Sequence, residues 1–197
     1  EALVEYLTFQ NYFSDRTLFK NVFVVPPGKI LSFSEGSPAP VVQQYWDFSF
    51  EQSQLVSNPN EIEEQLNFLF VNAVNRQLVS DVNVGSYLSG GIDSSAITAI
   101  ASKKLPYIST FTIGFDLNSA SGIELAYDER DSAERMSYLY KTQHYEMVLK
   151  AGDMERSMRK LVWHLDEPRV GQSYPNYYAA HLASKFSTVV LAGTGGD

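Results

Sequence analysis

A glycine-rich turn between two apolar runs constrains this chain more than any other stretch. Residues 83–100 read NVGSYLSGGIDSSAITAI. The apolar residues before Ser89 favour a buried strand, whereas Ile97, Ile100 and Ala101 recur at helical spacing after it. The stretch therefore predicts a strand, a tight loop and a helix, the unit from which parallel α/β sheets are built.

The loop itself has the chemistry of a phosphate site. Gly90 and Gly91 lack Cβ atoms where the backbone must turn and approach a ligand closely. Ser94 and Ser95 fall where the next helix presents unpaired N–H groups, which attract anions together with the positive end of the helix dipole. The pattern is neither the P-loop GxxxxGK[ST], because no lysine follows the glycines, nor GxGxxG. A plain strand-to-helix turn with an Asp/Ser cap is the alternative.

A second strand delivers a second glycine loop. Residues 187–192 read as a buried parallel strand, and GTGGD follows at residues 193–197. Ligands of open α/β sheets bind at the carboxyl ends of the strands. Asp93 and Asp197 would then flank a triphosphate, and Mg²⁺ takes oxygen ligands of this kind. We therefore expect these two carboxylates to hold the metal.

Composition excludes several classes of function. The net charge of −8 argues against general nucleic-acid binding, which favours a basic face. The chain has no cysteine, so disulfides, thiolate zinc sites and a cysteine nucleophile are excluded within it. No apolar run reaches ~18 residues and no signal-peptide pattern opens the chain. We expect a cytoplasmic protein without a membrane partner.

The pattern along the chain predicts two domains. Residues 1–50 favour strands at 22–25, 29–33 and 41–46, the first two joined by Pro-Pro-Gly, as in a hairpin or meander. Residues 51–60 are polar and read as a linker. The second domain, residues 61–197, should be α/β with a mostly parallel sheet.

Several elements are expected in the second domain. A helix of about five turns should begin at Glu61 and bury an apolar stripe that includes Ile62, Leu66 and Leu69. The remaining predictions are a strand at 108–115, a helix from 127, a strand at 144–149, a helix from 153 to Pro168 and a helix at 176–186. We expect His144 to have a packing or surface role.

Several motifs resemble those of a known family. SGGIDSS is similar to the SGGxDS pyrophosphate loop of ATP pyrophosphatases, which cleave ATP to AMP and pyrophosphate while adenylating a substrate. The order SGGIDSS, TFTIGFD, LDEP and AGTGGD resembles the synthetase domain of the glutamine-hydrolysing asparagine synthetase family over residues 62–197. More weakly, residues 1–50 resemble the end of that family's glutaminase domain, where LPPGH and YWD occur; Lys29 stands at the histidine position.

The resemblance implies a fold and a reaction. The fold is an adenine-nucleotide alpha-hydrolase-like sheet with helices on both faces. The reaction is ATP- and Mg²⁺-dependent adenylation of a carboxylate, with aspartate as the expected acid, followed by attack of glutamine-derived ammonia. The implied partners are these small molecules, and the family allows a homodimer.

The resemblance also implies roles for residues. Pyrophosphate and Mg²⁺ would be held by Ser89, Gly90, Gly91, Asp93, Ser94 and Ser95, with Asp197 as a further metal ligand. Leu88, Ile113 and Gly193 would line the AMP site, although residue chemistry alone makes Ile113 a core residue. Asp166, Glu167 and Ser173 would line the acceptor pocket, although helix-end polarity explains the two acids equally well. Asp93 and Thr194 would be the catalytic residues.

Departures from the family pattern leave alternatives open. The family commonly has SGEGxDE in the last loop, whereas this chain has Ala192 at the serine and Thr194 at the glutamate. The chain also ends before the glutamate and lysine expected downstream, so we expect a fragment of a longer polypeptide. The alternatives are an enzyme that amidates or cyclises another acid, and a non-catalytic or regulatory nucleotide-binding relative.

Overall fold

The computed structural model describes residues 1–49, 58–119, 128–169 and 173–194. These residues fall into two compact units. The first unit comprises Glu1–Ser57 and Leu165–Gly171, and the second comprises Asn58–His164 and Gln172–Asp197. Each unit has its own sheet.

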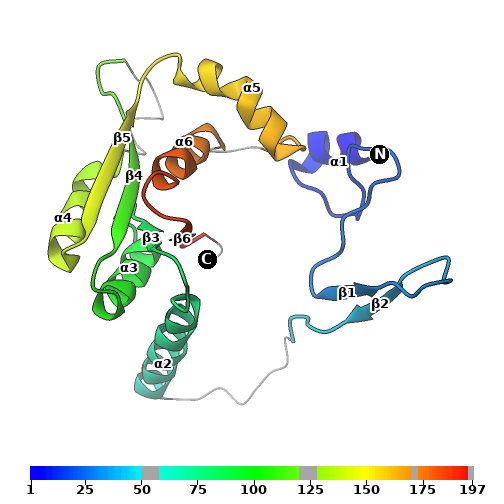
Figure 1. The fold of residues 1–197 in the computed structure, drawn as a ribbon, viewed down its shortest axis with the longest axis horizontal. Helices are drawn as coiled ribbons and strands as arrows, with labels where there is room; N and C mark the ends of the chain where they lie inside the picture. Colours follow the sequence, from blue (N-terminus) through cyan, green and yellow to red (C-terminus); the bar gives the residue numbers. More distant parts are fainter. Residues whose placement is uncertain (50–57, 120–127, 170–172, 195–197) are drawn as a thin grey trace. The chain divides into compact units, whose positions relative to one another are not determined.

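The second unit is built on a four-stranded parallel sheet (Figure 1). Its strands are β3 (Val84–Tyr87), β4 (Ser109–Phe115), β5 (Gln143–Leu149) and β6 (Val189–Leu191), in the spatial order β5-β4-β3-β6. Strand β4 pairs with β5 along its whole length, whereas β3 pairs with β4 only as far as Tyr87↔Phe111. The carboxyl end of β4 therefore extends beyond β3.

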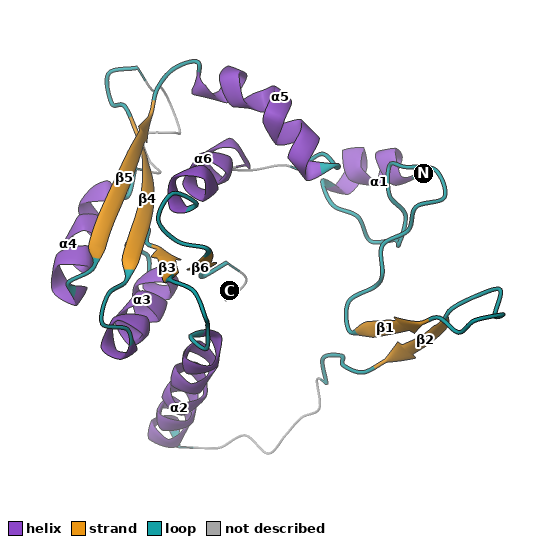
Figure 2. Ribbon diagram, viewed as in Figure 1, coloured by secondary structure: helices purple, strands orange, loops and turns teal. Residues whose placement is uncertain are grey.

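Helices cover both faces of this sheet. Its helices are α2 (Pro59–Gln77), α3 (Ile92–Lys104), α4 (Arg130–Tyr140), α5 (Asp153–Leu165) and α6 (Ser173–Ala183). Figure 2 shows α3 and α4 on one side of the sheet and α6 on the other. The α/β class with a parallel sheet, preceded by a small β segment, is thus confirmed.

Alternating side chains fix the two faces of the sheet, as expected for a period of two. On one face, the hydroxyl groups of Ser86 in β3 and Thr98 in α3 are 2.9 Å apart and buried. On the other face, Phe111 of β4 stacks on Tyr145 and Phe186, with ring centroids 5.9 and 6.0 Å away. Phe186 follows α6, so this aromatic cluster packs the end of α6 onto the sheet.

Two helices begin earlier than the sequence indicated. Helix α2 begins at Pro59 because the Asn58 side chain accepts a hydrogen bond from the Asn60 N–H (3.1 Å) and caps the helix. Helix α6 begins at Ser173 rather than 176, since Pro175 is tolerated in a first turn. The other predicted elements of this unit agree with the structure to within about three residues.

The prediction that α2 buries its apolar stripe was wrong for most of its length. Ile62, Leu66 and Leu69 are 47%, 65% and 56% exposed, and within the described part of α2 only Val74 is buried. In this unit α2 contacts α3. One neighbouring helix does not cover a stripe that runs over five turns.

The first unit contains helix α1 (Ala2–Phe9) and one antiparallel hairpin, β1 (Lys29–Ser32) with β2 (Val41–Gln44). The predicted strand at residues 22–25 was wrong: Phe23 forms only an isolated bridge with Arg16. Pro26 and Pro27 have no N–H to donate to a ladder. The carbonyl of Gly28 instead accepts from the Tyr45 N–H (2.9 Å), so the hairpin closes through the later turn.

No helix within the described ranges is long and apolar enough to cross a membrane.

We expect Gly85→Ala to destabilise the second unit. A Cβ at this position would lie 2.6 Å from a ring carbon of Phe111 and 2.8 Å from the Ser187 hydroxyl. Overpacking of this kind costs about 1–3 kcal/mol in the free energy of unfolding, measurable by urea denaturation. The cost should shrink in a Phe111→Leu background, where the ring carbon is gone. Equal costs in both backgrounds would contradict this packing.

Candidate functional site

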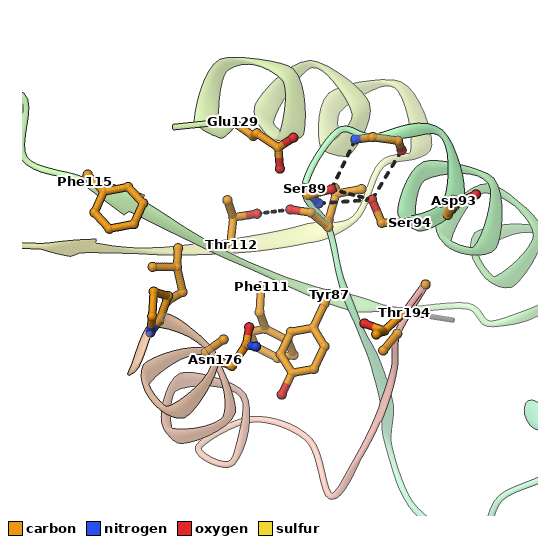
Figure 3. Close-up of a pocket in the computed structure, with 17 residues that line it drawn as sticks. Tyr87, Ser89, Asp93, Ser94, Phe111, Thr112, Phe115, Glu129, Asn176 and Thr194 are labelled. Atoms are coloured by element: carbon orange, nitrogen blue, oxygen red, sulfur yellow. Dashed lines mark hydrogen bonds between the residues drawn. The ribbon is translucent and has the colours of Figure 1, made fainter. Parts of the chain in front are cut away.

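The first glycine loop closes on itself through its serines. Between β3 and α3, the hydroxyl groups of Ser89 and Ser94 are 3.0 Å apart (Figure 3). The Ser94 hydroxyl also accepts from the Ser89 N–H (3.2 Å), and the Ser89 hydroxyl accepts from the Gly91 N–H (3.2 Å). These hydrogen bonds restrain the loop to one conformation.

Helix α3 begins immediately at this loop, with Gly91 as its N-cap. The first N–H with a helical partner is that of Ser95, which donates to the Gly91 carbonyl (3.0 Å). The N–H groups of Ile92, Asp93 and Ser94 precede it and have no intrahelical acceptor. Together with the helix dipole they form an anion-binding end.

Two predicted phosphate residues do not line the hollow described below. Gly90 has φ +81° and packs against α4, where a Cβ would lie 2.8 Å from the carbonyl carbon of Ser132. Ser95 is 7% exposed, and its hydroxyl has no hydrogen-bond partner among the described residues. Close packing against α4 therefore explains the glycine at position 90 without reference to a ligand.

The second glycine loop lies directly against the first. Strand β6 pairs with β3, and Gly193 follows it so closely that a Cβ there would be 3.0 Å from the Asp93 Cβ and 3.1 Å from the Ser94 nitrogen. The sequence-predicted loops are therefore brought together at one edge of the sheet. Asp197, the second predicted metal ligand, lies outside the described residues.

A hollow of about 560 Å³ opens between these loops, β4 and α6. Eight of its lining residues were predicted from the sequence: Leu88, Ser89, Gly91, Asp93, Ser94, Ile113, Gly193 and Thr194. The others are Tyr87, Phe111, Thr112, Phe115, Glu129, Pro175, Asn176, Ala179 and Ala192. All of them belong to the second unit.

The lining residues that the sequence did not predict come mostly from α6, the start of α4 and strand β4. The alternation of β4 could have indicated Phe111 and Phe115 beside Ile113, since all three lie on one face of a strand. No local signal marks Glu129 or Asn176. Burial raises the pKa of the Tyr87 phenol, whose ring lines the hollow at the end of β3.

The wall of the hollow includes an open strand edge. The Leu88 N–H donates to the Phe111 carbonyl (3.0 Å), and the Thr112 hydroxyl donates back to the Leu88 carbonyl. Backbone groups of a strand alternate in direction, so the N–H and carbonyl of Ile113 point to the same side as those of Phe111. Because β3 has ended there, these groups face the hollow.

The charge of the described lining is negative. Asp93 and Glu129 are its charged side chains, and no lysine or arginine is among the lining residues that the structure describes. Within the described lining, the backbone N–H groups at the start of α3 are the groups that can stabilise an anion. Mg²⁺ usually takes one or two carboxylates plus phosphate oxygens, and the exposed Asp93 fits that pattern. No group of three or more metal-binding side chains occurs in the described ranges, so an all-protein cage is not formed there.

An ion pair fixes the start of α4 on the end of β4. The Arg130 guanidinium donates to both carboxylate oxygens of Asp128, at 2.6 Å in the shortest bond, and to the Phe115 carbonyl at 3.1 Å. Gly114 makes room for it, because a Cβ there would collide with the Arg130 side chain. The guanidinium lowers the pKa of the Asp128 carboxyl, which is 11% exposed.

The packing or surface role expected for His144 stays a prediction, and the structure places its ring between β4 and β5 residues. Its Nδ1 lies 2.9 Å from the Thr110 hydroxyl and its Nε2 lies 3.1 Å from the Glu146 carboxylate. The side chain is 10% exposed and is not part of the lining of the hollow. Both ring nitrogens are thus engaged with neighbouring strand residues.

The predicted acceptor residues are divided between the units. Asp166 and Glu167 follow α5 in the first unit, where Asp166 has φ +57°. Ser173 begins α6 in the second unit. The acceptor pocket remains a prediction.

Fold and hollow together define an α/β domain with two glycine loops at the carboxyl edge of its parallel sheet. The asparagine synthase family model matches residues 65–197, and the chain belongs to this family.

Three curated relatives illustrate the similarity. A putative glutamine-hydrolyzing asparagine synthetase of Mycobacterium tuberculosis is 31% identical over 198 residues, covering 100% of this chain and 29% of the relative. Glutamine-hydrolyzing asparagine synthetase 1 of Bacillus subtilis is 30% identical, with 100% and 30% covered. A putative synthetase of the same description from Methanocaldococcus jannaschii is 33% identical over 187 residues, with 93% and 34% covered. The chain spans about a third of the length of these relatives.

Solved structures give a weaker likeness. NMN synthetase from Francisella tularensis matches with a TM-score of 0.37 and 16% identity, covering 68% of this chain and 53% of that one. The NH3-dependent NAD synthetase from Campylobacter jejuni matches with a TM-score of 0.38 and 12% identity, covering 64% and 54%.

We expect Asp128→Asn to destabilise the second unit by about 1.5–3 kcal/mol at neutral pH, since it removes charged hydrogen bonds from a mostly buried pair. Folding lowers the pKa of the Asp128 carboxyl from its ordinary value of 3.8. The carboxylate therefore stabilises the folded state above pH 3.8, and this stabilisation is lost as the pH falls below that value. The difference between wild type and variant, measured by urea unfolding from pH 7 to pH 2, should therefore shrink in acid. A difference that stays constant would contradict the ion pair.

Proposed function

We propose that this chain carries the ATP site of an amide-forming ligase of the asparagine synthase type. The enzyme would adenylate a carboxylate, aspartate in the simplest case, and release pyrophosphate. Ammonia derived from glutamine would then attack the acyl-adenylate. The single observation that carries the proposal is the contact between two glycine loops at the carboxyl edge of a parallel sheet, where Gly193 meets Asp93 and Ser94.

The loop end of the hollow suits the β- and γ-phosphates. The free N–H groups at the start of α3 point at a ligand without side-chain reorganisation, and preorganised donors of this kind stabilise charge that develops on a leaving group. The serine bonds between Ser89 and Ser94 keep the loop in place. Asp93 would share Mg²⁺ with the phosphate oxygens, and Asp197 is proposed as its second carboxylate.

The β4 end of the hollow suits adenine. Ile113 and Phe115 provide apolar contact, and Pro175 lies on the α6 side. The open N–H and carbonyl of Ile113 match the acceptor N1 and donor N6 on the edge of adenine. Leu88 and Gly193 would line the space between base and phosphates.

The reaction needs little acid–base chemistry at the first step. An oxygen of the acceptor carboxylate would attack the α-phosphorus, the bond from the α-phosphorus to the bridging oxygen of the β-phosphate would break, and the N–H groups at the start of α3 would stabilise the charge on the departing pyrophosphate. Mg²⁺, if held by Asp93, would supply further positive charge there. Ammonia would then attack the acyl carbon, the bond from that carbon to the AMP oxygen would break, and the proton that the nitrogen loses would pass to the departing AMP or to water. The role of the chain is positioning, charge stabilisation and exclusion of water.

Thr194 favours a second candidate for the acceptor. It lines the hollow where the family pattern commonly has glutamate, and a hydroxyl cannot supply a carboxylate's charge or proton affinity. An enzyme that amidates or cyclises another acid retains the same ATP site. A regulatory relative would bind ATP without turnover.

An assay of the intact protein with Mg-ATP, glutamine or ammonia, and aspartate tests the proposal. We expect AMP and pyrophosphate in equal amounts, with asparagine as a third product. Pyrophosphate that appears only with another acid would support the second acceptor class. Complete absence of ATP turnover with every acid tried would refute the ligase.

We also expect Asp93→Asn to weaken Mg-ATP binding about tenfold, which corresponds to about 1.4 kcal/mol. The loss should be seen by calorimetry in Mg²⁺ and should disappear in EDTA, because the carboxylate acts through the metal. Asp81→Asn, which also removes an exposed charge but before β3, is the matched control and should bind as wild type does. Unchanged affinity in Asp93→Asn would remove this residue from the metal site.

A further inference from the structure

The first turn of α4 lies between the end of β4 and the first glycine loop. The turn is closed by the Ala133 N–H, which donates to the Glu129 carbonyl (3.0 Å). At its beginning, the Arg130 side chain binds the last carbonyl of β4. At its end, Ser132 and Ala133 lie against Gly90 of the loop. One hydrogen-bonded turn therefore connects the end of β4 with the loop.

The contact with Gly90 leaves the loop no room on the α4 side. A Cβ at Gly90 would lie 2.8 Å from the Ser132 carbonyl carbon and 2.9 Å from the Ala133 nitrogen. Backbone thus packs on backbone, which glycine at φ +81° permits. On the side of α3, the loop is closed by the hydroxyl groups of Ser89 and Ser94. The position of the loop backbone therefore depends on the position of the α4 turn.

Arg130 sets the position of that turn. Its Nε and Nη2 donate to the two carboxylate oxygens of Asp128 (2.8 and 2.6 Å), and Nη2 also donates to the Phe115 carbonyl (3.1 Å). The side chain fills the space over Gly114, where the three atoms nearest to an added Cβ all belong to Arg130. Arg130 does not line the hollow, so its effect on a ligand there must pass through the turn.

We infer that Arg130 is a positioning residue for the first glycine loop. It holds the first turn of α4 against Gly90 and thereby fixes the N–H groups that would bind the β- and γ-phosphates. The inference rests on the proposed ATP site and adds a residue outside the hollow on which the phosphate end depends. Binding groups must be held within about 0.5 Å of their productive geometry by the residues behind them.

The test compares the affinities of Mg-ATP and AMP for the intact protein by calorimetry, because only ATP carries the β- and γ-phosphates. Wild type should bind Mg-ATP more tightly than AMP. In Arg130→Ala, the affinity for Mg-ATP should fall about tenfold while the affinity for AMP stays unchanged. Arg135→Ala removes an exposed charge from the same helix and should bind both nucleotides as wild type does.

A second variant tests the path through the turn without removing the charge. Gly114→Ala should displace the Arg130 side chain and reproduce the selective loss of Mg-ATP affinity. In the Arg130→Ala background, the same change should have no further effect, because the displaced side chain is already gone. Additive losses would show that the two residues act separately and would overturn the inference.

The outcomes separate this inference from the proposed function. If wild type prefers Mg-ATP and every variant keeps that preference, Arg130 does not position the loop and the ATP site stands. Equal losses for Mg-ATP and AMP in variants that circular dichroism shows to be folded would also overturn the inference. If Arg130→Ala does not fold, Arg130→Lys, which keeps a donor for Asp128, decides by the same comparison. If wild type binds neither nucleotide, the proposed function itself fails.

Discussion

The parallel pairing of β3 with β6 is the constraint on which the site depends. The register Val84↔Val189, Gly85↔Val190 and Ser86↔Leu191 joins two segments from distant parts of the chain. Both strands end at the same edge, so the loops that follow them meet. Without that pairing, each glycine loop is only a turn, and the two loops that the proposed phosphate site needs are not brought together.

A second constraint is the unequal length of neighbouring strands. Strand β4 continues to Phe115 after β3 has ended at Tyr87, and the resulting step leaves backbone groups of Ile113 without a neighbouring strand. The Asp128–Arg130 pair then attaches α4 to the projecting end of β4. The hollow thus has a polar end at the loops and a mostly apolar wall along β4, a division that matches the two ends of a nucleotide.

How much the sequence predicts depends on the range of the interactions. The SGGIDSS loop, the β4 strand and the Gly193 loop were predictable because their signals are local: glycines in turns and apolar residues at regular spacing. Glu129 and Asn176 were not, since tertiary packing of α4 and α6 brings them to the hollow. The strand expected at residues 22–25 failed for another reason, namely that β-forming side chains do not specify a partner strand, and Phe23 forms only an isolated bridge with Arg16. The exposed Leu66 shows likewise that apolar periodicity predicts a helix but not what covers it.

The central claim is that ATP binds at the two glycine loops. The most direct test is a crystal structure of the protein with Mg²⁺ and an ATP analogue in which a methylene group bridges the α- and β-phosphates. The β-phosphate should lie against the N–H groups at the start of α3, beside Gly193, with Mg²⁺ on Asp93 and the base next to the backbone of Ile113. A nucleotide bound elsewhere, or in this hollow with its phosphates directed away from the two glycine loops, would contradict the proposed site.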